Sequence, residues 1–124
     1  MKTSLFRAIA FLLVQLSLMG CANVQKERDQ FRAQLRAWVG RPADSLVTSS
    51  LGAPNSTYQM SGGGTVLRYV WHEKGRISGL SYDCEMNFQV DSSGVIRDIR
   101  YKGSGGTVYD NSEDVCDYLV GRQL

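Results

Sequence analysis

The sequence predicts an α+β fold. Two N-terminal helices pack on a small antiparallel meander sheet of three to four strands, and a short helix follows the sheet. Two observations support this prediction. Apolar residues recur at helical spacing as far as Leu51, and beyond Pro54 they alternate with a period of two as far as Tyr101. Glycine-rich or Asp/Ser-rich segments separate the alternating runs, which favours hairpins between consecutive strands.

The first helix is predicted over Val24 to Val39, a run without proline or glycine. Its apolar face recurs at helical spacing and consists of Phe31, Leu35 and Trp38. Gly40 ends this helix. A second helix is expected to begin at Pro42, which suits a first turn, and to end at Gly52, which can adopt a left-handed cap. The short apolar face of the second helix is formed by Leu46, Val47 and Leu51.

Four alternating segments are predicted as strands. The first surrounds Tyr58, and the others are Thr65 to His72, Cys84 to Val90, and Val95 to Tyr101. The third segment alternates most clearly. Its apolar face consists of Cys84, Met86, Phe88 and Val90, and its polar face of Glu85, Asn87 and Gln89. This strand is therefore expected to bury one side only.

A terminal helix is predicted after Asn111 and Ser112, which can cap it. Its i, i+4 apolar pairs would place one face on the sheet and bring Cys116 toward Cys84. Paired thiols in an oxidising compartment tend to form disulfides, so we expect Cys84 and Cys116 to be bonded. The alternative is a metal site, for which two cysteines and a single histidine are a poor ligand set.

The first twenty residues have the pattern of a secretory leader. Lys2 and Arg7 precede a twelve-residue apolar run, Ala8 to Met19, which is too short for a spanning helix and contains polar residues. Leu18-Met19-Gly20-Cys21 closes this run and resembles the lipobox of bacterial lipoproteins. The alternative is an ordinary signal peptide that leaves a free thiol.

The lipobox resemblance implies a thioether diacylglycerol on Cys21, removal of the preceding leader and acylation of the new amine. Several acyl chains hold a protein on a bilayer almost permanently. Ala22 stands where an aspartate would resemble an inner-membrane retention signal. The expected location is therefore the outer membrane, with the protein facing the periplasm.

The first predicted helix also carries a row of cations at i, i+4 and i+8, namely Arg28, Arg32 and Arg36. The acid placed near this row is Asp29, beside Arg32. One interpretation is a solvated helix face. The other is contact with anionic phospholipid headgroups, each cation contributing on the order of 1 kcal/mol.

The residues offer little chemistry for catalysis, metals or nucleic acid, and we expect no enzyme activity and no cofactor. His72 is the single histidine, and Glu73 beside it does not form a zincin motif. Ser61-Gly62-Gly63-Gly64 is not followed by the lysine of a phosphate loop. The net charge of +2 resides in the leader, so residues 21–124 are formally neutral and give no reason to expect a nucleic-acid partner.

The order of parts resembles a known family. The matching residues are Gly40-Arg41-Pro42, Asp44, Leu46-Val47, Leu51-Gly52-Ala53-Pro54, Tyr58 and Leu67-Arg68-Tyr69. They are similar to the SmpA/OmlA (BamE-like) lipoprotein domain, over roughly Gly40 to Tyr101. The family's domain has two helices on a three-stranded antiparallel sheet, and a related fold occurs in β-lactamase inhibitor protein repeats. The cysteine pair and the acidic terminal helix depart from that pattern and point equally to a paralogous envelope lipoprotein.

The expected organisation is a leader over residues 1–20, an anchor and first helix over 21–39, and a BamE-like domain over 40–124. The resemblance implies a non-enzymatic envelope lipoprotein that binds protein partners, including the barrel-assembly machinery. Contact would be made through the exposed sheet face or the loop Glu73 to Gly79, in which Arg76 and Ile77 are candidates. The alternative is an inhibitor-type or ligand-binding periplasmic module.

Overall fold

The computed structural model describes residues 23–75, 79–105 and 112–124. The chain divides into two compact units, residues 1–30 and residues 31–124. In the first unit, the described residues 23–30 are helical, and the Gln25 side-chain amide donates a hydrogen bond to Asp29 at 3.1 Å. The second unit contains the sheet and is described below.

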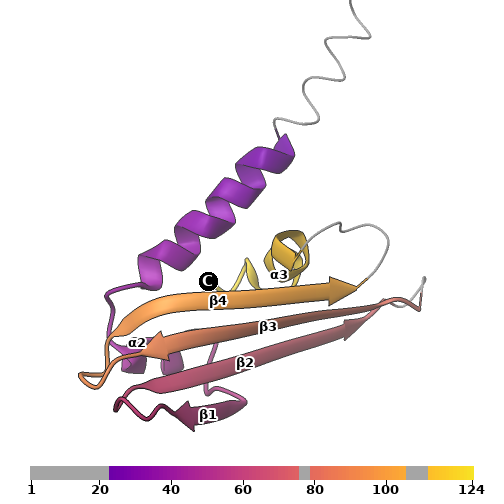
Figure 1. Ribbon diagram of the computed structural model, residues 1–124. Coiled ribbons are helices and arrows are strands. Elements are labelled where there is room, and N and C mark those ends of the chain that lie inside the picture. The colour runs from indigo at the N-terminus through magenta and orange to yellow at the C-terminus, as the bar shows by residue number, and fades with distance from the viewer. Residues whose placement is uncertain (1–22, 76–78, 106–111) are drawn as a thin grey trace, which may run out of the picture. The chain divides into compact units, whose positions relative to one another are not determined.

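The second unit is built on one antiparallel sheet (Figure 1). Its strands are β1 (Ser56–Gln59), β2 (Thr65–Lys74), β3 (Ser81–Val90) and β4 (Ile96–Gly105). They follow one another in space in the order β1-β2-β3-β4, so each strand pairs with its neighbour in the sequence. The predicted α+β class and antiparallel meander are confirmed, with four strands.

The alternation predicted for the third strand is present in β3, whose residues are buried and half-buried in turn from Tyr82 to Val90. Cys84, Met86 and Phe88 are fully buried. They form the centre of a core to which β2 contributes Leu67 and Tyr69. The period-two pattern therefore placed every side chain from Cys84 to Val90 on the correct face.

Helical residues 31–38 open the second unit and pack into this core through Phe31, Leu35 and Trp38. The predicted second helix is much shorter than expected: α2 spans only Ala43–Val47, and Leu46 is its buried residue. The hydroxyls of Thr48 and Ser49 donate to carbonyls one turn back, at 3.0 and 2.6 Å. Such side-chain bonds compete with helix propagation, which explains the early end.

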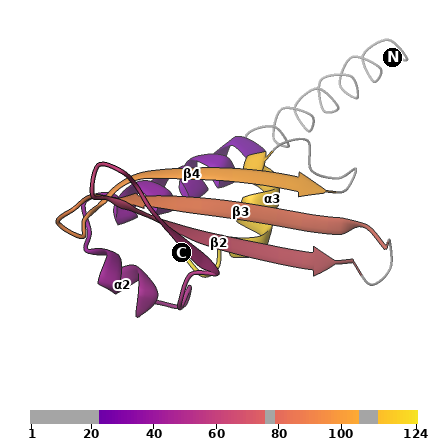
Figure 2. The same cartoon turned by 60° about the horizontal axis from the view of Figure 1, so that its bottom comes forward.

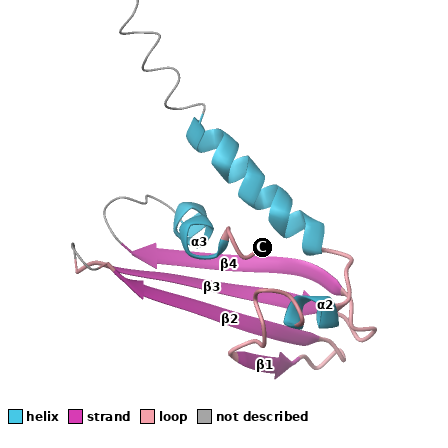
Figure 3. Ribbon diagram, turned by 180° about the vertical axis from the view of Figure 1, so that it is seen from behind, coloured by secondary structure: helices cyan, strands magenta, loops and turns pink. Residues whose placement is uncertain are grey.

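Helix α3 (Ser112–Val120) lies on the same side of the sheet as the core. Figure 3 shows α2 and α3 near opposite ends of the strands. As predicted, α3 buries one face, with Val115, Cys116 and Val120 at 1% exposure or less. Cys116 forms a disulfide with Cys84, with a sequence separation of 32.

Gly105, at the end of β4, is required by a close backbone approach. Its φ is +135°, and a Cβ at this position would lie 2.1 Å from the carbonyl oxygen of Ser81 and 2.7 Å from Cα of Tyr82. Both the conformation and the space exclude a side chain. The last residue of β4 therefore holds the end of this strand tightly against β3.

Candidate functional site

The face of the sheet opposite α3 is the candidate functional site, and we call it the open face. Figure 2 looks onto this face, with α3 behind the strands. Residues 31–38, α2 and α3 all contribute to the core on the other side. The strand registers place these side chains on the open face: Tyr58, Val66, Arg68, Val70, His72, Lys74, Asp83, Glu85, Asn87, Gln89, Asp98, Arg100, Lys102 and Ser104.

The centre of the open face is an ion pair between β2 and β3. Arg68 donates from Nη2 to Oε2 of Glu85 at 2.8 Å, and the Asn87 amide donates to Oε1 at 3.0 Å. The Arg68 hydrogen bond, followed by that of Asn87, lowers the pKa of Glu85 to about 2. The positive charges of Arg68 and Lys102 act in the same direction. Glu85 is therefore ionised at neutral pH.

The other acids of the open face also have cationic or imidazole neighbours. His72 Nδ1 is hydrogen-bonded to Asp83 across the β2–β3 pair, and Arg100 donates to Asp98 at 3.0 Å. Positive and negative groups thus alternate across the surface. A surface of this kind suits a protein partner with its own charge pattern, whereas nucleic acid is bound by patches of one sign.

One row of the open face contains the three residue types of a hydrolytic triad. The registers align His72 with Asp83 and Asp83 with Ser104. A triad needs the imidazole between the hydroxyl and the carboxylate, since the imidazole takes the hydroxyl proton. In this row the carboxylate lies in the middle, which is the wrong order. Among the described residues, no three His, Cys, Asp or Glu side chains form a group able to hold a metal ion.

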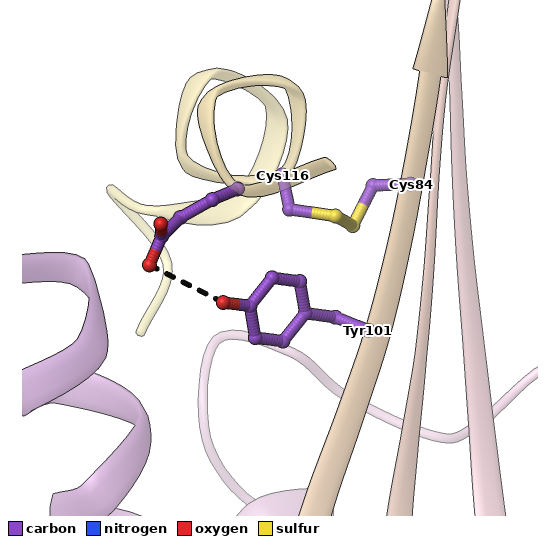
Figure 4. The surroundings of a disulfide bond; sticks show 4 residues. Cys84, Tyr101 and Cys116 are labelled. Atoms are coloured by element: carbon purple, nitrogen blue, oxygen red, sulfur yellow. Dashed lines mark hydrogen bonds between the residues drawn. A yellow bond between two sulfur atoms is a disulfide. The ribbon is translucent and has the colours of Figure 1, made fainter. Parts of the chain in front are cut away.

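On the covered side of the sheet, α3 is held by the disulfide and by a partly buried polar cluster (Figure 4). Arg32 binds both carboxylate oxygens of Glu113, and the Arg32 Nη2 to Oε2 distance is 2.9 Å. Glu113 is only 7% exposed. The Tyr101 hydroxyl donates to Oε1 of Glu113 at 3.2 Å, and burial, with the negative charge of Glu113, raises the pKa of this hydroxyl.

This cluster changes the interpretation of the arginine row. Arg32 pairs with Glu113, an acid 81 residues away on α3. Glu113 belongs to the terminal helix that the sequence marks as acidic, and its side chain is buried. No short-range signal could have identified this pair, because its two residues come from opposite ends of the chain. Arg36 is exposed, and Arg28 is half-buried within the first unit.

Several predicted site residues fall outside the described residues. These are the lipidation residue Cys21 and the loop residues Arg76 and Ile77. Their predicted roles remain predictions. The predicted bond between Cys84 and Cys116 is confirmed.

Comparison with known proteins gives no relative for this chain. No protein-family model matches it, and no curated protein or solved structure is significantly similar. Within residues 23–75, 79–105 and 112–124, no helix has the length and apolar character needed to cross a bilayer.

Proposed function

We propose that this chain is a non-enzymatic lipoprotein of the bacterial envelope, anchored through Cys21 to the outer membrane and facing the periplasm. Its role is to bind a protein partner in outer-membrane assembly or integrity. The observation that carries the proposal is the buried disulfide between Cys84 and Cys116. Such bonds persist in oxidising compartments, in agreement with a leader that ends in Leu18-Met19-Gly20-Cys21.

The arrangement of elements also supports the resemblance to the SmpA/OmlA (BamE-like) domain. Helical residues 31–38, the short helix α2 and an antiparallel meander occur in the order that the family implies. Gly52 has the left-handed conformation expected at Leu51-Gly52-Ala53-Pro54, with a φ of 68°, but it follows a turn and does not cap α2, which ends at Val47. The fourth strand and the disulfide are additions, and we therefore favour a paralogous member.

Partner binding is assigned to the open face. Its charges are held in fixed positions by pairs such as Arg68 with Glu85, and half-buried Val66 and Val70 lie beside them. A preorganised pattern of this kind gives specificity and orientation at a protein interface. Because Arg32 pairs with Glu113, the proposed contact with anionic headgroups is assigned to the other two arginines of the row, Arg28 and Arg36.

Affinity purification from detergent-solubilised membranes tests this function. The informative variant exchanges the charges of the central pair, Arg68→Glu with Glu85→Arg, because it keeps an ion pair while reversing the pattern. Recovery of barrel-assembly proteins with the wild-type chain, and their loss with the exchanged chain, supports the proposal. Recovery of a periplasmic enzyme instead supports the inhibitor-type function. Equal recovery with both chains rejects the open face as the binding surface.

Headgroup contact is tested with purified Cys21→Ser chain and lipid vesicles. Binding that rises with the fraction of anionic phospholipid, and falls in Arg28→Gln with Arg36→Gln, is the expected result. Binding that is independent of anionic lipid contradicts the headgroup assignment and leaves the protein-binding role intact.

A further inference from the structure

Strand β1 covers only part of the neighbouring strand. It has four residues against ten in β2, and their register runs from Ser56 opposite Arg68 to Gln59 opposite Thr65. From Tyr69 to Lys74, β2 pairs with β3 on one side. On the other side, no strand of the described chain lies beside this half of β2 (Figure 1).

The backbone groups that face this uncovered edge can be identified from two hydrogen bonds. The Arg68 carbonyl accepts from the Asn55 N–H at 2.9 Å, and the Val70 N–H donates to the Asn55 side chain at 2.7 Å. Residues 68 and 70 therefore direct their backbone groups toward the β1 side. Because alternate residues of a strand bond to opposite sides, His72 and Lys74 do the same. In the described chain, nothing pairs with the backbone groups of these two residues on that side.

The side chains along this edge define the chemistry of an incoming strand. His72 and Lys74 lie on the open face, and no described carboxylate is within ion-pair distance of Lys74. On the covered side, half-buried Trp71 packs against the core. Glu73 already accepts a hydrogen bond from the Tyr118 hydroxyl at 3.2 Å. An acidic residue opposite Lys74 and an apolar residue opposite Trp71 would match this edge.

A second copy of the same chain fits this edge poorly. Antiparallel self-pairing centred on His72 would place Lys74 of one copy opposite Val70 of the other, so Lys74 would meet no acid. The Val70 N–H is already bonded to Asn55 and cannot serve the pairing. Charged residues on an edge also disfavour self-association. The edge therefore favours a different sequence.

We propose that the edge of β2 from Val70 to Lys74, called the β2 edge site, binds an extended acidic segment of a partner protein as an added antiparallel strand. Main-chain hydrogen bonds at His72 and Lys74 provide affinity, and the side chains opposite Lys74 and Trp71 provide selectivity. This inference deepens the proposed function and rests on it for the identity of the partner as an envelope protein. The added strand would extend the sheet beyond β1 and lie beside the open face.

Solution NMR on the full chain in detergent micelles tests this site directly. The probe is a synthetic peptide with the core Glu-Thr-Glu-Val-Thr, whose first glutamate would lie opposite Lys74 and whose valine would lie opposite Trp71. Saturable shifts of the His72 and Lys74 amides, with slowed hydrogen exchange at both, are the expected result. The same peptide with N-methylated backbone amides, and a Lys-Thr-Lys-Val-Thr peptide, should each bind at least about tenfold more weakly.

Two variants separate backbone from charge recognition. His72→Pro removes an edge N–H without touching the bonds to β3, and it should weaken the acidic peptide about tenfold. Its matched control is Thr57→Pro on the free side of β1, which should leave peptide binding unchanged. Lys74→Glu should reverse the preference between the acidic and basic peptides. Because it leaves the backbone intact, this second variant remains informative if the proline chain folds poorly.

Three outcomes would overturn the β2 edge site. The first is shifts confined to the centre of the open face around Glu85, and the second is no saturable binding by any peptide. The third is protection of the His72 amide in peptide-free chain that elutes as a dimer, which would make a second copy the occupant. Peptide binding does not require the lipid anchor. Partner recovery from membranes without peptide binding therefore removes this inference alone. Peptide binding by a wild-type chain that carries no lipid and does not fractionate with membranes removes the envelope assignment alone.

Discussion

Removing the disulfide should destabilise the second unit by an amount set mainly by the loop that it closes. Cys84 and Cys116 are separated by 32 residues. Cross-linking a loop of this length restricts the unfolded chain by about 4 kcal/mol in the chain-entropy model. Small domains have a total free energy of unfolding of about 5–15 kcal/mol. The Cys84→Ala, Cys116→Ala chain should therefore melt about 15–30 °C below the wild type.

Thermal unfolding followed by circular dichroism measures this difference, with Cys21→Ala as the control that leaves the bond intact. Hydrogen exchange should localise the loss to α3, whose buried Val115 and Val120 rest on the sheet beside the bond. A double variant that melts within about 5 °C of the wild type would refute the reasoning. It would mean that packing of α3 holds the unit without the covalent link.

Three further predictions concern other contacts. Glu113→Gln should lower the free energy of unfolding by about 1–2 kcal/mol, because Arg32 loses its charged partner. The loss is modest because the Arg32 side chain is 44% exposed and solvent screens its charge, and an unchanged urea midpoint would contradict this prediction. NMR titration should place the pKa of the Glu85 carboxyl near 2 in the wild-type chain, and this pKa should rise toward 4.5 in Arg68→Ala. Because folding depresses the Glu85 pKa, the ion pair stabilises the fold above pH 4.5, and this stabilisation is lost as the pH falls toward 2. Gly105→Ala should cost about 2 kcal/mol by urea unfolding, and a neutral effect would show that the end of β4 can move.

The sheet could be predicted from the sequence because its signal is local. Alternation in β3 identifies both faces without reference to any other segment, and Asp91-Ser92-Ser93-Gly94 specifies the turn that returns the chain. In that turn the Asp91 carboxylate accepts the N–H groups of Ser93 and Val95 at 2.9 and 3.0 Å. Such side-chain bonds to nearby backbone groups are readable from the residue types alone.

The length of α2 and the contacts that hold α3 could not be predicted from the sequence. Propensity and the apolar face of Leu46, Val47 and Leu51 favoured two turns or more, but the hydroxyls of Thr48 and Ser49 end the helix early. The pairing of Arg32 with Glu113 depends on tertiary placement, since 81 residues separate the two. The β2 edge site could likewise be identified only from the strand register, which shows that β1 pairs with β2 no further than Ser56 opposite Arg68.

The most direct measurement of lipid anchoring is metabolic labelling of bacteria with an alkyne palmitate analogue, comparing the wild-type chain with Cys21→Ser. Incorporation of the label into the wild-type chain, its absence from the variant, and recovery of the labelled chain in the outer-membrane fraction are the predicted results. An unlabelled wild-type chain recovered from periplasmic extract would contradict an envelope protein held on the membrane by its own cysteine.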